Sequence, residues 1–310
     1  MKHDLICIGT ALVDSIIRGF DPTPVSASGY LAESGTLSAG GEAVNEATAA
    51  AKLGLNTGIF CALGNDPAGE IVLSELRKNG VDTGSVVRTE TTPVTTMFVR
   101  ADGTRQSVTN QAHRFNFHPE NDPPRFTDAK AVILGSLFRV PFDDPGIIHA
   151  VVSHSKAAGQ LVIADTKLPN FRFLTLEDLR ESLPLVDYIT PNEDEARHFT
   201  GKDDPEEMAD VFLGYGVKHV IIKLGSRGCF LKSGTITIRL PACSIQAVDA
   251  TGAGDNFAAG FASEILRGAT EEEALRFANA CGAICTTATG AGTALKNREQ
   301  VIRFMEKHVL

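Results

Sequence analysis

The sequence lacks the features that mark membrane, zinc and nucleic-acid-binding proteins. No window approaches the run of about 18 apolar residues that a membrane helix needs. None of the six cysteines forms a CxxC pair, and the eight histidines include no HExxH motif, so a zinc site is not expected. The net charge is -9, and no block of Lys and Arg offsets it. We therefore expect no membrane span and no binding of nucleic acid.

Signals for secretion are also missing. Asp4 precedes a short apolar run at the N-terminus, which does not suit a signal peptide. Most of the cysteines lie in apolar runs, which favours buried thiols in a reduced compartment over disulfides. They are Cys7, Cys61, Cys229, Cys243, Cys281 and Cys285. We therefore predict a soluble cytoplasmic protein.

Short apolar runs recur along the 310 residues, and most of them lack strict alternation between apolar and polar residues. Such runs are typical of strands that are buried on both faces, as in a parallel sheet covered by helices. The runs are DLICIG (4–9), TGIFCALG (57–64), AVILG (131–135), LVIAD (161–165), VDYIT (186–190) and HVIIKLG (219–225).

Helix-like segments lie between these runs. GEAVNEATAAAKLG (41–54) carries a face of small residues, and PAGEIVLSELRKNG (67–80) opens with Pro67; both end at a glycine. Five further segments have helical patterns, at 143–158, 204–213, 253–267, 271–289 and 298–308. The alternation of strand and helix predicts a layered α/β fold.

Two segments interrupt this alternation. Residues 15–38 are strand-like and contain no helical pattern. Residues 86–110 alternate Thr, Val and Arg around an ADGTR turn, which is typical of an antiparallel hairpin with one polar face. Two β segments inserted into an α/β core favour a flap over a site, although a plain edge hairpin has the same pattern.

Three small residues, Gly252-Ala253-Gly254, directly precede Asp255 in VDATGAGDNF (248–257). A helix N-terminus offers unpaired N–H groups, and glycines let the backbone approach a phosphate. The dinucleotide motif GxGxxG is excluded because Phe257 occupies its third glycine position, and neither a P-loop nor the HRD and DFG motifs are present. Asp255 can then accept a proton from an attacking hydroxyl while the amides stabilise a transferring phosphoryl group. A simple helix cap is the alternative.

Two further segments carry candidate ligand-binding residues. In AGGEAVNEA (39–47), Asn45 lies one turn inside a predicted helix and can present its amide to a ligand, although capping or packing would also explain it. In TPNEDEA (190–196), Asn192 and Glu195 follow a strand end. Glu195 can hold a water molecule on Mg²⁺ there, and the start of a surface helix is the alternative.

Together these segments resemble the ribokinase or PfkB carbohydrate kinase family, in their order and their spacing. The resemblance rests on GTALVD, GGEAVN with AAAKLG, ALGNDPAGE, PNEDEA, KLGSRG, DATGAGDNF and FANACGAICTTATGAGT, and so covers nearly the whole chain. It implies one kinase domain over residues 1–310, with a ribokinase-like, three-layer Rossmann-like core around a mostly parallel sheet. It also implies a small β-sheet lid formed by segments of about 15–38 and 86–112, and a homodimer that forms through this lid.

The resemblance implies a role for each matching residue. Asp255 would be the general base, beside an anion hole formed by Gly252, Ala253 and Gly254. The sugar would contact Asp14, Gly40, Gly41, Asn45 and Arg105. ATP would be bound by Asn192, Glu195, Lys223, Gly225, Ser226, Gly228 and Asn279, with Glu195 acting on Mg²⁺ through water. Asp249, Thr251 and Gly290 match positions at which many members bind a monovalent cation such as potassium.

Departures from the family pattern narrow the substrate. Leu12 stands where ribokinases carry Asn and is similar to fructokinase-like members, and Glu42 replaces a Lys, which disfavours an anionic substrate. Pro169 occupies the place of the Arg with which 2-keto-3-deoxygluconate kinases bind a carboxylate, although Arg172 lies nearby. The lid side chains Arg100, Arg105, His113 and Arg114 either reach the substrate or lie on a solvated hairpin.

We therefore predict an enzyme that transfers the γ-phosphoryl group of ATP to a hydroxyl of a neutral monosaccharide, fructose-like or ribose-like. A nucleoside kinase of the same family is one alternative, with Phe98, Phe115 and Phe117 as a wall for the base. A 2-keto-3-deoxygluconate kinase is another. A sugar-binding protein that has lost the chemistry is the third.

Overall fold

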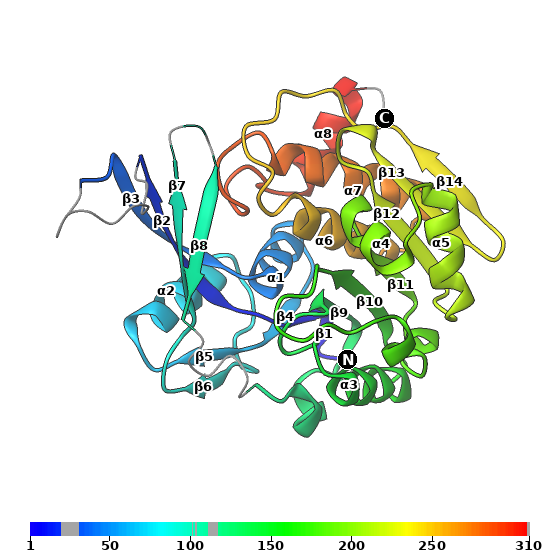
Figure 1. Ribbon diagram of the computed structural model, residues 1–310, viewed down its shortest axis with the longest axis horizontal. Helices are drawn as coiled ribbons and strands as arrows, with labels where there is room; N and C mark the ends of the chain where they lie inside the picture. The colour runs from blue at the N-terminus through cyan, green and yellow to red at the C-terminus, as the bar shows by residue number, and fades with distance from the viewer. Residues whose placement is uncertain (20–30, 101, 103, 111–116, 309–310) are drawn as a thin grey trace.

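A computed structural model describes residues 1–19, 31–100, 102, 104–110 and 117–308 (Figure 1). Its largest sheet has eight strands in the order β14-β13-β12-β11-β10-β9-β1-β4. Six of them run parallel: β1 (His3–Ile8), β4 (Thr57–Phe60), β9 (Ala129–Leu137), β10 (Leu161–Thr166), β11 (Tyr188–Thr190) and β12 (His219–Lys223). These strands confirm the six predicted runs. An antiparallel hairpin, β13 (Cys229–Ser233) and β14 (Thr237–Leu240), closes one edge and was not predicted.

Helices cover both faces of this sheet, which explains the nearly unbroken apolar runs. Leu5 and Cys7 of β1 belong to one hydrophobic core, whereas Ile6 and Ile8 belong to the other, as the alternation of side chains along a strand requires. The first face carries α1 (Glu42–Lys52), α6 (Ala253–Ile265), α7 (Glu271–Cys285) and α8 (Arg298–His308). The second face carries α3 (Pro145–Ala157), α4 (Glu193–Thr200) and α5 (Pro205–Gly214). The predicted three-layer α/β architecture is confirmed.

A smaller sheet of four strands lies beside helix α2 (Pro67–Lys78) and is drawn on the left of Figure 1. Its order is β3-β2-β7-β8, and its strands are β2 (Leu12–Arg18), β3 (Ser34–Gly40), β7 (Val94–Val99) and β8 (Arg105–Thr109). The parallel pairing of β2 with β7 joins the two β segments that interrupt the α/β alternation in the sequence. The predicted separate sheet is therefore present, and we call it the small sheet.

Two further segments differ from the sequence prediction. The run 57–64 contains two strands, because only β4 joins the main sheet and β5 (Ala62–Gly64) pairs with β6 (Val87–Thr89) in a third sheet. The helix predicted over 271–289 ends at Cys285. There the hydroxyls of Thr286 and Thr287 donate to carbonyls three residues earlier, which competes with continued helix. The pattern of the sequence did not reveal these local hydrogen bonds.

Short 3-10 helices complete the chain, at Pro119–Asn121, Pro123–Arg125, Glu177–Leu179, Leu183–Leu185 and Gly225–Arg227. All six cysteines are buried, as the sequence predicted. Within the described ranges, no helix combines the length and the apolar composition that crossing a bilayer requires.

The side on which successive strands join the sheet changes at β1. Strand β4 lies on one side of β1, and the later parallel strands, beginning with β9, lie on the other. In open α/β sheets, ligands bind at the carboxyl ends of the strands near such a switch point. Asp165, Thr190 and Lys223 lie at the carboxyl ends of β10, β11 and β12. The fold therefore brings several predicted and unpredicted polar residues to one edge of the sheet.

Candidate active site

Helix α6 begins at a glycine with a backbone conformation that other residues rarely adopt. Gly252 has a φ of 76°, and a Cβ at this position would lie 2.2 Å from the Cβ of Ala291. The amide of Ala253 donates to the carbonyl of Ala250 at 3.2 Å, whereas the amides of Gly252 and Gly254 have no acceptor among the described residues. The helix start therefore presents free N–H groups and admits close approach of a ligand.

Asp255 lies in the first turn of α6 and is 3% exposed. Its Oδ2 accepts a hydrogen bond of 2.7 Å from the Asn45 amide, and its Oδ1 lies 3.8 Å from Lys167 Nζ. Burial raises the pKa of Asp255; Lys167 opposes the rise, and Glu42 adds to it. No side chain caps the first turn of α6, so the helix-cap alternative does not describe this carboxylate.

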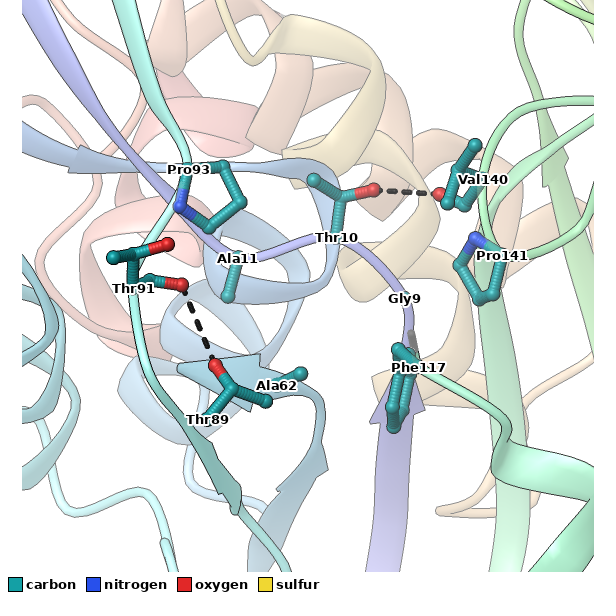
Figure 2. Close-up of a pocket in the computed structure, with 10 residues that line it drawn as sticks. All are labelled: Gly9, Thr10, Ala11, Ala62, Thr89, Thr91, Pro93, Phe117, Val140 and Pro141. Carbon is teal, nitrogen blue, oxygen red and sulfur yellow. Dashed lines mark hydrogen bonds between the residues drawn. The ribbon is translucent and has the colours of Figure 1, made fainter. Parts of the chain in front are cut away.

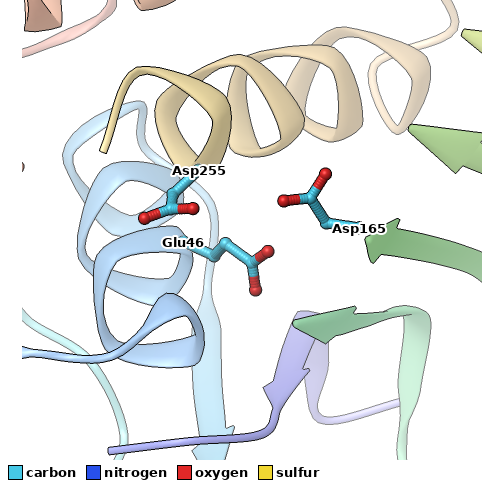
Figure 3. Close-up of side chains that lie close together, drawn as sticks. All are labelled: Glu46, Asp165 and Asp255. Carbon is cyan, nitrogen blue, oxygen red and sulfur yellow. The ribbon is translucent and has the colours of Figure 1, made fainter. Parts of the chain in front are cut away.

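Two acids that the sequence prediction missed lie beside Asp255. Figure 3 shows the side chains of Glu46 of α1, Asp165 of β10 and Asp255 of α6 close together, and one oxygen from each lies within 4.8 Å of the others. All three carboxylates are buried. A charged residue within an alanine-rich helix face was the available signal for Glu46, because Glu is almost never fully buried without a partner.

The predicted pair Asn192 and Glu195 forms a capping box at the start of α4. The Glu195 amide donates to Asn192 Oδ1 at 2.9 Å, and the Asn192 amide donates to Glu195 Oε2 at 2.8 Å. Thr166 Oγ1 also donates to this oxygen, at 2.8 Å. Burial raises the pKa of Glu195, and Lys223 opposes that rise. Glu195 is 4% exposed, so its carboxylate lies in the interior, whereas Asp194 in the same first turn is 82% exposed.

Lys223 connects the end of β12 with the start of α6. Its ammonium donates to Asp165 Oδ1, which also accepts a hydrogen bond of 2.6 Å from Thr190 Oγ1. A Cβ built on Gly254 would lie 3.1 Å from Lys223 Nζ, so this positive charge lies directly beside the helix N-terminus. The remaining predicted nucleotide residues follow it: Gly225 (φ 57°), Ser226 and Gly228 (φ 95°) form the turn before β13, and Asn279 of α7 donates to the Pro241 carbonyl at 3.3 Å.

A cleft of about 720 Å³ opens between the small sheet and the core. Asp14, Asn45 and Arg105 line it together. Burial, together with the charge of Glu42, raises the pKa of Asp14 to about 6. Gly40 makes room for this carboxylate, because a Cβ there would lie 2.1 Å from Asp14 Oδ2, and Gly41 starts α1 with a φ of 99°. The structure therefore brings three of the predicted sugar residues into one cleft, and Gly40 and Gly41 are not among the residues that line it.

The predicted cation residues also lie together. Asp249 Oδ1 accepts hydrogen bonds from the Thr251 amide at 3.0 Å and hydroxyl at 2.7 Å, and Oδ2 accepts one from the Gly290 amide at 3.1 Å. Arg105 of the small sheet approaches the same carboxylate at 3.5 Å. Burial alone would raise the pKa of Asp249, but these hydrogen bonds and Arg105 lower it.

Other predicted substrate residues lie elsewhere or outside the described chain. Phe117 lines a small separate pocket with Gly9 and Thr10 (Figure 2), and Phe98 falls between the cleft residues Met97 and Val99, so it faces the other side of its strand. The guanidinium of Arg172 pairs with Asp144 at 3.0 Å. Arg100 donates to Gln106 at 3.0 Å on the hairpin. His113, Arg114 and Phe115 lie outside the described residues.

Several known proteins are similar to this chain over most of its length. The ribokinase of Haemophilus influenzae is 29% identical over 273 residues, which cover 86% of this chain and 87% of the relative. The 2-dehydro-3-deoxygluconokinase of Bacillus subtilis is 29% identical over 304 residues, with 89% and 90% covered. Fructokinase-1 of Oryza sativa is 29% identical over 319 residues, with 97% of both chains covered.

Solved structures of similar shape have been determined with ligands. Arabidopsis thaliana ribokinase complexed with ribose and ATP superposes with a TM-score of 0.87 at 28% identity and covers 99% of each chain. A ribokinase-like protein of E. coli in complex with ATP and Mg²⁺ has a TM-score of 0.79 at 26% identity, with 98% of this chain and 99% of that chain covered. The profile of the pfkB family carbohydrate kinases matches residues 2–298. The chain therefore belongs to the pfkB family of carbohydrate kinases.

Proposed function

We propose that this sugar kinase transfers the γ-phosphoryl group of ATP to a hydroxyl of a neutral monosaccharide, fructose-like or ribose-like, in the cytoplasm. One observation carries the proposal: the buried carboxylate of Asp255 stands in the first turn of α6, beside the amides of Gly252 and Gly254, which have no acceptor in the described ranges. A carboxylate with a raised pKa is suited to take a proton near neutral pH. Free amides at a helix N-terminus are suited to stabilise a transferring phosphoryl group.

Each part of the site then has one task. Asn45 holds Oδ2 of Asp255 and lines the sugar cleft, so it can orient the base toward the acceptor hydroxyl. Asp255 removes the proton of that hydroxyl as its oxygen attacks the γ-phosphorus. Gly252 and Gly254 donate to the phosphoryl oxygens, and Lys223 contributes positive charge beside them. In this proposal ATP lies along the turn Gly225 to Gly228 and reaches toward Asn279.

Magnesium fits the residues at the strand ends. The Oε2 atom of Glu195 is held by Thr166 and Asn192, while Oε1 makes no hydrogen bond to a described residue and can receive a metal-bound water. Bound Mg²⁺ would neutralise charge on the phosphates of ATP. The potassium positions fit less well, because Asp249 already accepts three hydrogen bonds and faces Arg105.

The preference for a neutral sugar rests on the charges around the acceptor. Asp14 lines the cleft, and Glu42 lies close enough to raise its pKa, so this end of the cleft repels an anion. Arg172, the candidate for binding a substrate carboxylate, pairs with Asp144 instead. We therefore keep the 2-keto-3-deoxygluconate and nucleoside reactions as arms of the test.

A substrate panel tests the proposed function. Purified protein is incubated with ATP, Mg²⁺ and one of fructose, ribose, 2-keto-3-deoxygluconate or adenosine, and ADP release and product phosphate are measured. We expect turnover with fructose or ribose, and none when EDTA removes the metal. Turnover restricted to adenosine or to the acidic sugar would refute the substrate class, and sugar binding without ADP release would refute the kinase reaction.

The titration of Asp14 leads to a pH-dependent affinity. An ionised carboxylate is a stronger acceptor for sugar hydroxyls than a neutral one, and Asp14, with a pKa of about 6, is ionised above that pH. We expect the Kd for the sugar, measured by calorimetry, to rise by about tenfold between pH 7 and pH 5, as the ionised fraction falls. The Asp14→Asn variant should bind weakly with little change over the same range. An equal pH dependence in that variant would remove this role.

We also propose that the small sheet serves as the lid over the sugar and as the contact of a homodimer. Its edge strands β3 and β8 expose two large apolar residues, Leu37 and Val108, each 62% exposed. Exposed apolar edges favour association with a second chain. The Val108→Glu variant should sediment as a monomer at concentrations where the wild type is dimeric. A wild type that is monomeric throughout the micromolar range would refute the dimer.

A further inference from the structure

Glu46 is the most unusual buried group of the described chain. It lies within α1, is 0% exposed, and neither of its carboxylate oxygens has a hydrogen-bond partner among the described residues. The space for it depends on Gly135 of β9, where a Cβ would come within 2.7 Å of Glu46 Oε2. A buried charge without a partner is costly, so this carboxylate requires a proton or a counter-charge.

The neighbours of Glu46 already have their counter-charges. Asp165 pairs with Lys223 and accepts from Thr190, and Asp255 accepts from Asn45 and lies near Lys167. Within the part of the chain that the structure describes, however, each neighbour keeps one oxygen without a hydrogen-bond partner, Asp165 Oδ2 and Asp255 Oδ1. One oxygen from each of the three carboxylates lies within 4.8 Å of the others (Figure 3). The cluster therefore contains acceptor oxygens to which no described residue donates.

We propose that Glu46 is a positioning residue that carries a proton and donates it as a hydrogen bond to Oδ1 of Asp255. The donated bond leaves the covalent O–H on Glu46, so no group is transferred. A donor to a carboxylate stabilises its ionised form. Glu46 thus keeps Asp255 ionised in a buried site while Asn45 holds the other oxygen.

The charges that face Glu46 support its neutral form. Burial raises the pKa of Glu46 well above its usual range, with Asp165 of β10, Asp255 of α6 and Glu42 of its own helix acting in the same direction. Lys167 alone opposes them, and the Cys7 thiol of β1 is uncharged because burial raises its pKa too. Two carboxylates in contact in a buried site share one proton in the same way.

The reading that competes with this proposal is a divalent cation held by the three carboxylates. Lys167 and Lys223 already supply two positive charges to the cluster, which disfavours a third. The two readings predict opposite results when the carboxyl group is removed. Loss of a neutral donor raises the pKa of Asp255, whereas loss of a negative charge lowers it.

Two substitutions test the proposal. The kinetic measurement rests on the proposed function, because it needs turnover. Glu46→Gln keeps a neutral donor of the same shape, and Glu46→Leu removes the donor. The acid limb of the kcat profile, measured at saturating sugar so that the titration of Asp14 does not contribute, should stay in place in the Gln variant. In the Leu variant the limb should move up by about one pH unit, which gives a loss of about tenfold at pH values well below the limb. Glu264→Gln is the control, since this buried α6 glutamate pairs with Arg298 and lies outside the cluster. Calorimetric ADP binding verifies that each variant is folded.

Every other outcome overturns the proposal. A limb that moves down in both variants would show an ionised Glu46. Full loss of activity in Glu46→Gln, together with loss of Mn²⁺ binding in a titration, would favour the cation. An unchanged limb in Glu46→Leu would show no coupling. Infrared difference spectra between wild type and Glu46→Gln should contain the carbonyl band of a protonated acid at pH 7. This readout needs no turnover, so it stands or fails independently of the kinase reaction.

Discussion

Replacing Asp255 with asparagine should lower kcat by about a hundredfold or more, the scale of a lost general base. The amide keeps the size of the side chain and an oxygen that can accept from Asn45, but it cannot take the proton of the acceptor hydroxyl. A hundredfold loss corresponds to about 2.7 kcal/mol of transition-state stabilisation. Steady-state ADP release at saturating sugar measures this effect, and calorimetry should give an unchanged Kd for ATP.

The control for this variant removes an exposed carboxylate of the same kind. Asp194→Asn, in the first turn of α4, should leave kcat within about twofold, because this side chain lies at the surface. Asp255→Asn should not destabilise the fold, since it removes one charge from a cluster of three buried acids. Turnover near that of the wild type would remove the general-base role, and unfolding of the variant would show that the carboxylate is structural.

Replacing Lys223 with methionine should reduce the free energy of unfolding by about 3–5 kcal/mol, the cost of leaving a buried charge without its partner. Asp165 is 0% exposed, and among the residues that the structure describes only Lys223 brings a positive charge within hydrogen-bond distance of it. Methionine retains most of the aliphatic stem, so the loss reports mainly on the ion pair. Equilibrium unfolding in urea without nucleotide measures the change.

A lysine on the adjacent strand provides the matched control. Lys232 of β13 pairs with Glu206 and Asp210, which are 56% and 57% exposed, and Lys232→Met should cost about 1 kcal/mol or less. The double variant Asp165→Asn with Lys223→Met should recover part of the stability, because the uncompensated charge is gone. If Lys223→Met costs no more than Lys232→Met, the buried pair does not stabilise the strand ends.

The strands and helices were predictable because their signals are local. Runs such as LVIAD and HVIIKLG are apolar on both faces, and only a sheet covered on both sides buries such runs. The family prediction is confirmed for the same reason, since its motifs are short segments of fixed spacing. The hairpin of β13 and β14 was not predicted although TITIRL alternates, because it directly follows KLGSRG, which the family resemblance assigns to ATP binding.

The candidate site was predictable only in part. The backbone amides at Gly252 to Gly254 and the carboxylate of Asp255 belong to four consecutive residues, so the sequence alone was enough to predict that they lie together. Asn192 and Glu195 were read as ligands, and the structure adds that they cap α4 through reciprocal hydrogen bonds. Glu46 and Lys167 were missed because each lies close to charged residues that are more than 80 positions away in the sequence, on α6 and β10.

By itself, the sequence determined the layered α/β fold, the family and the place where a helix N-terminus meets an acid, because periodicity and short motifs are properties of neighbouring residues. Only the tertiary structure decided which charges face one another. The carboxyl ends of parallel strands and the starts of α1 and α6 converge at one edge, and there Asp165 meets Lys223 and Glu46 meets Asp255. Electrostatic energy depends on distance and burial, and no spacing along the chain encodes either.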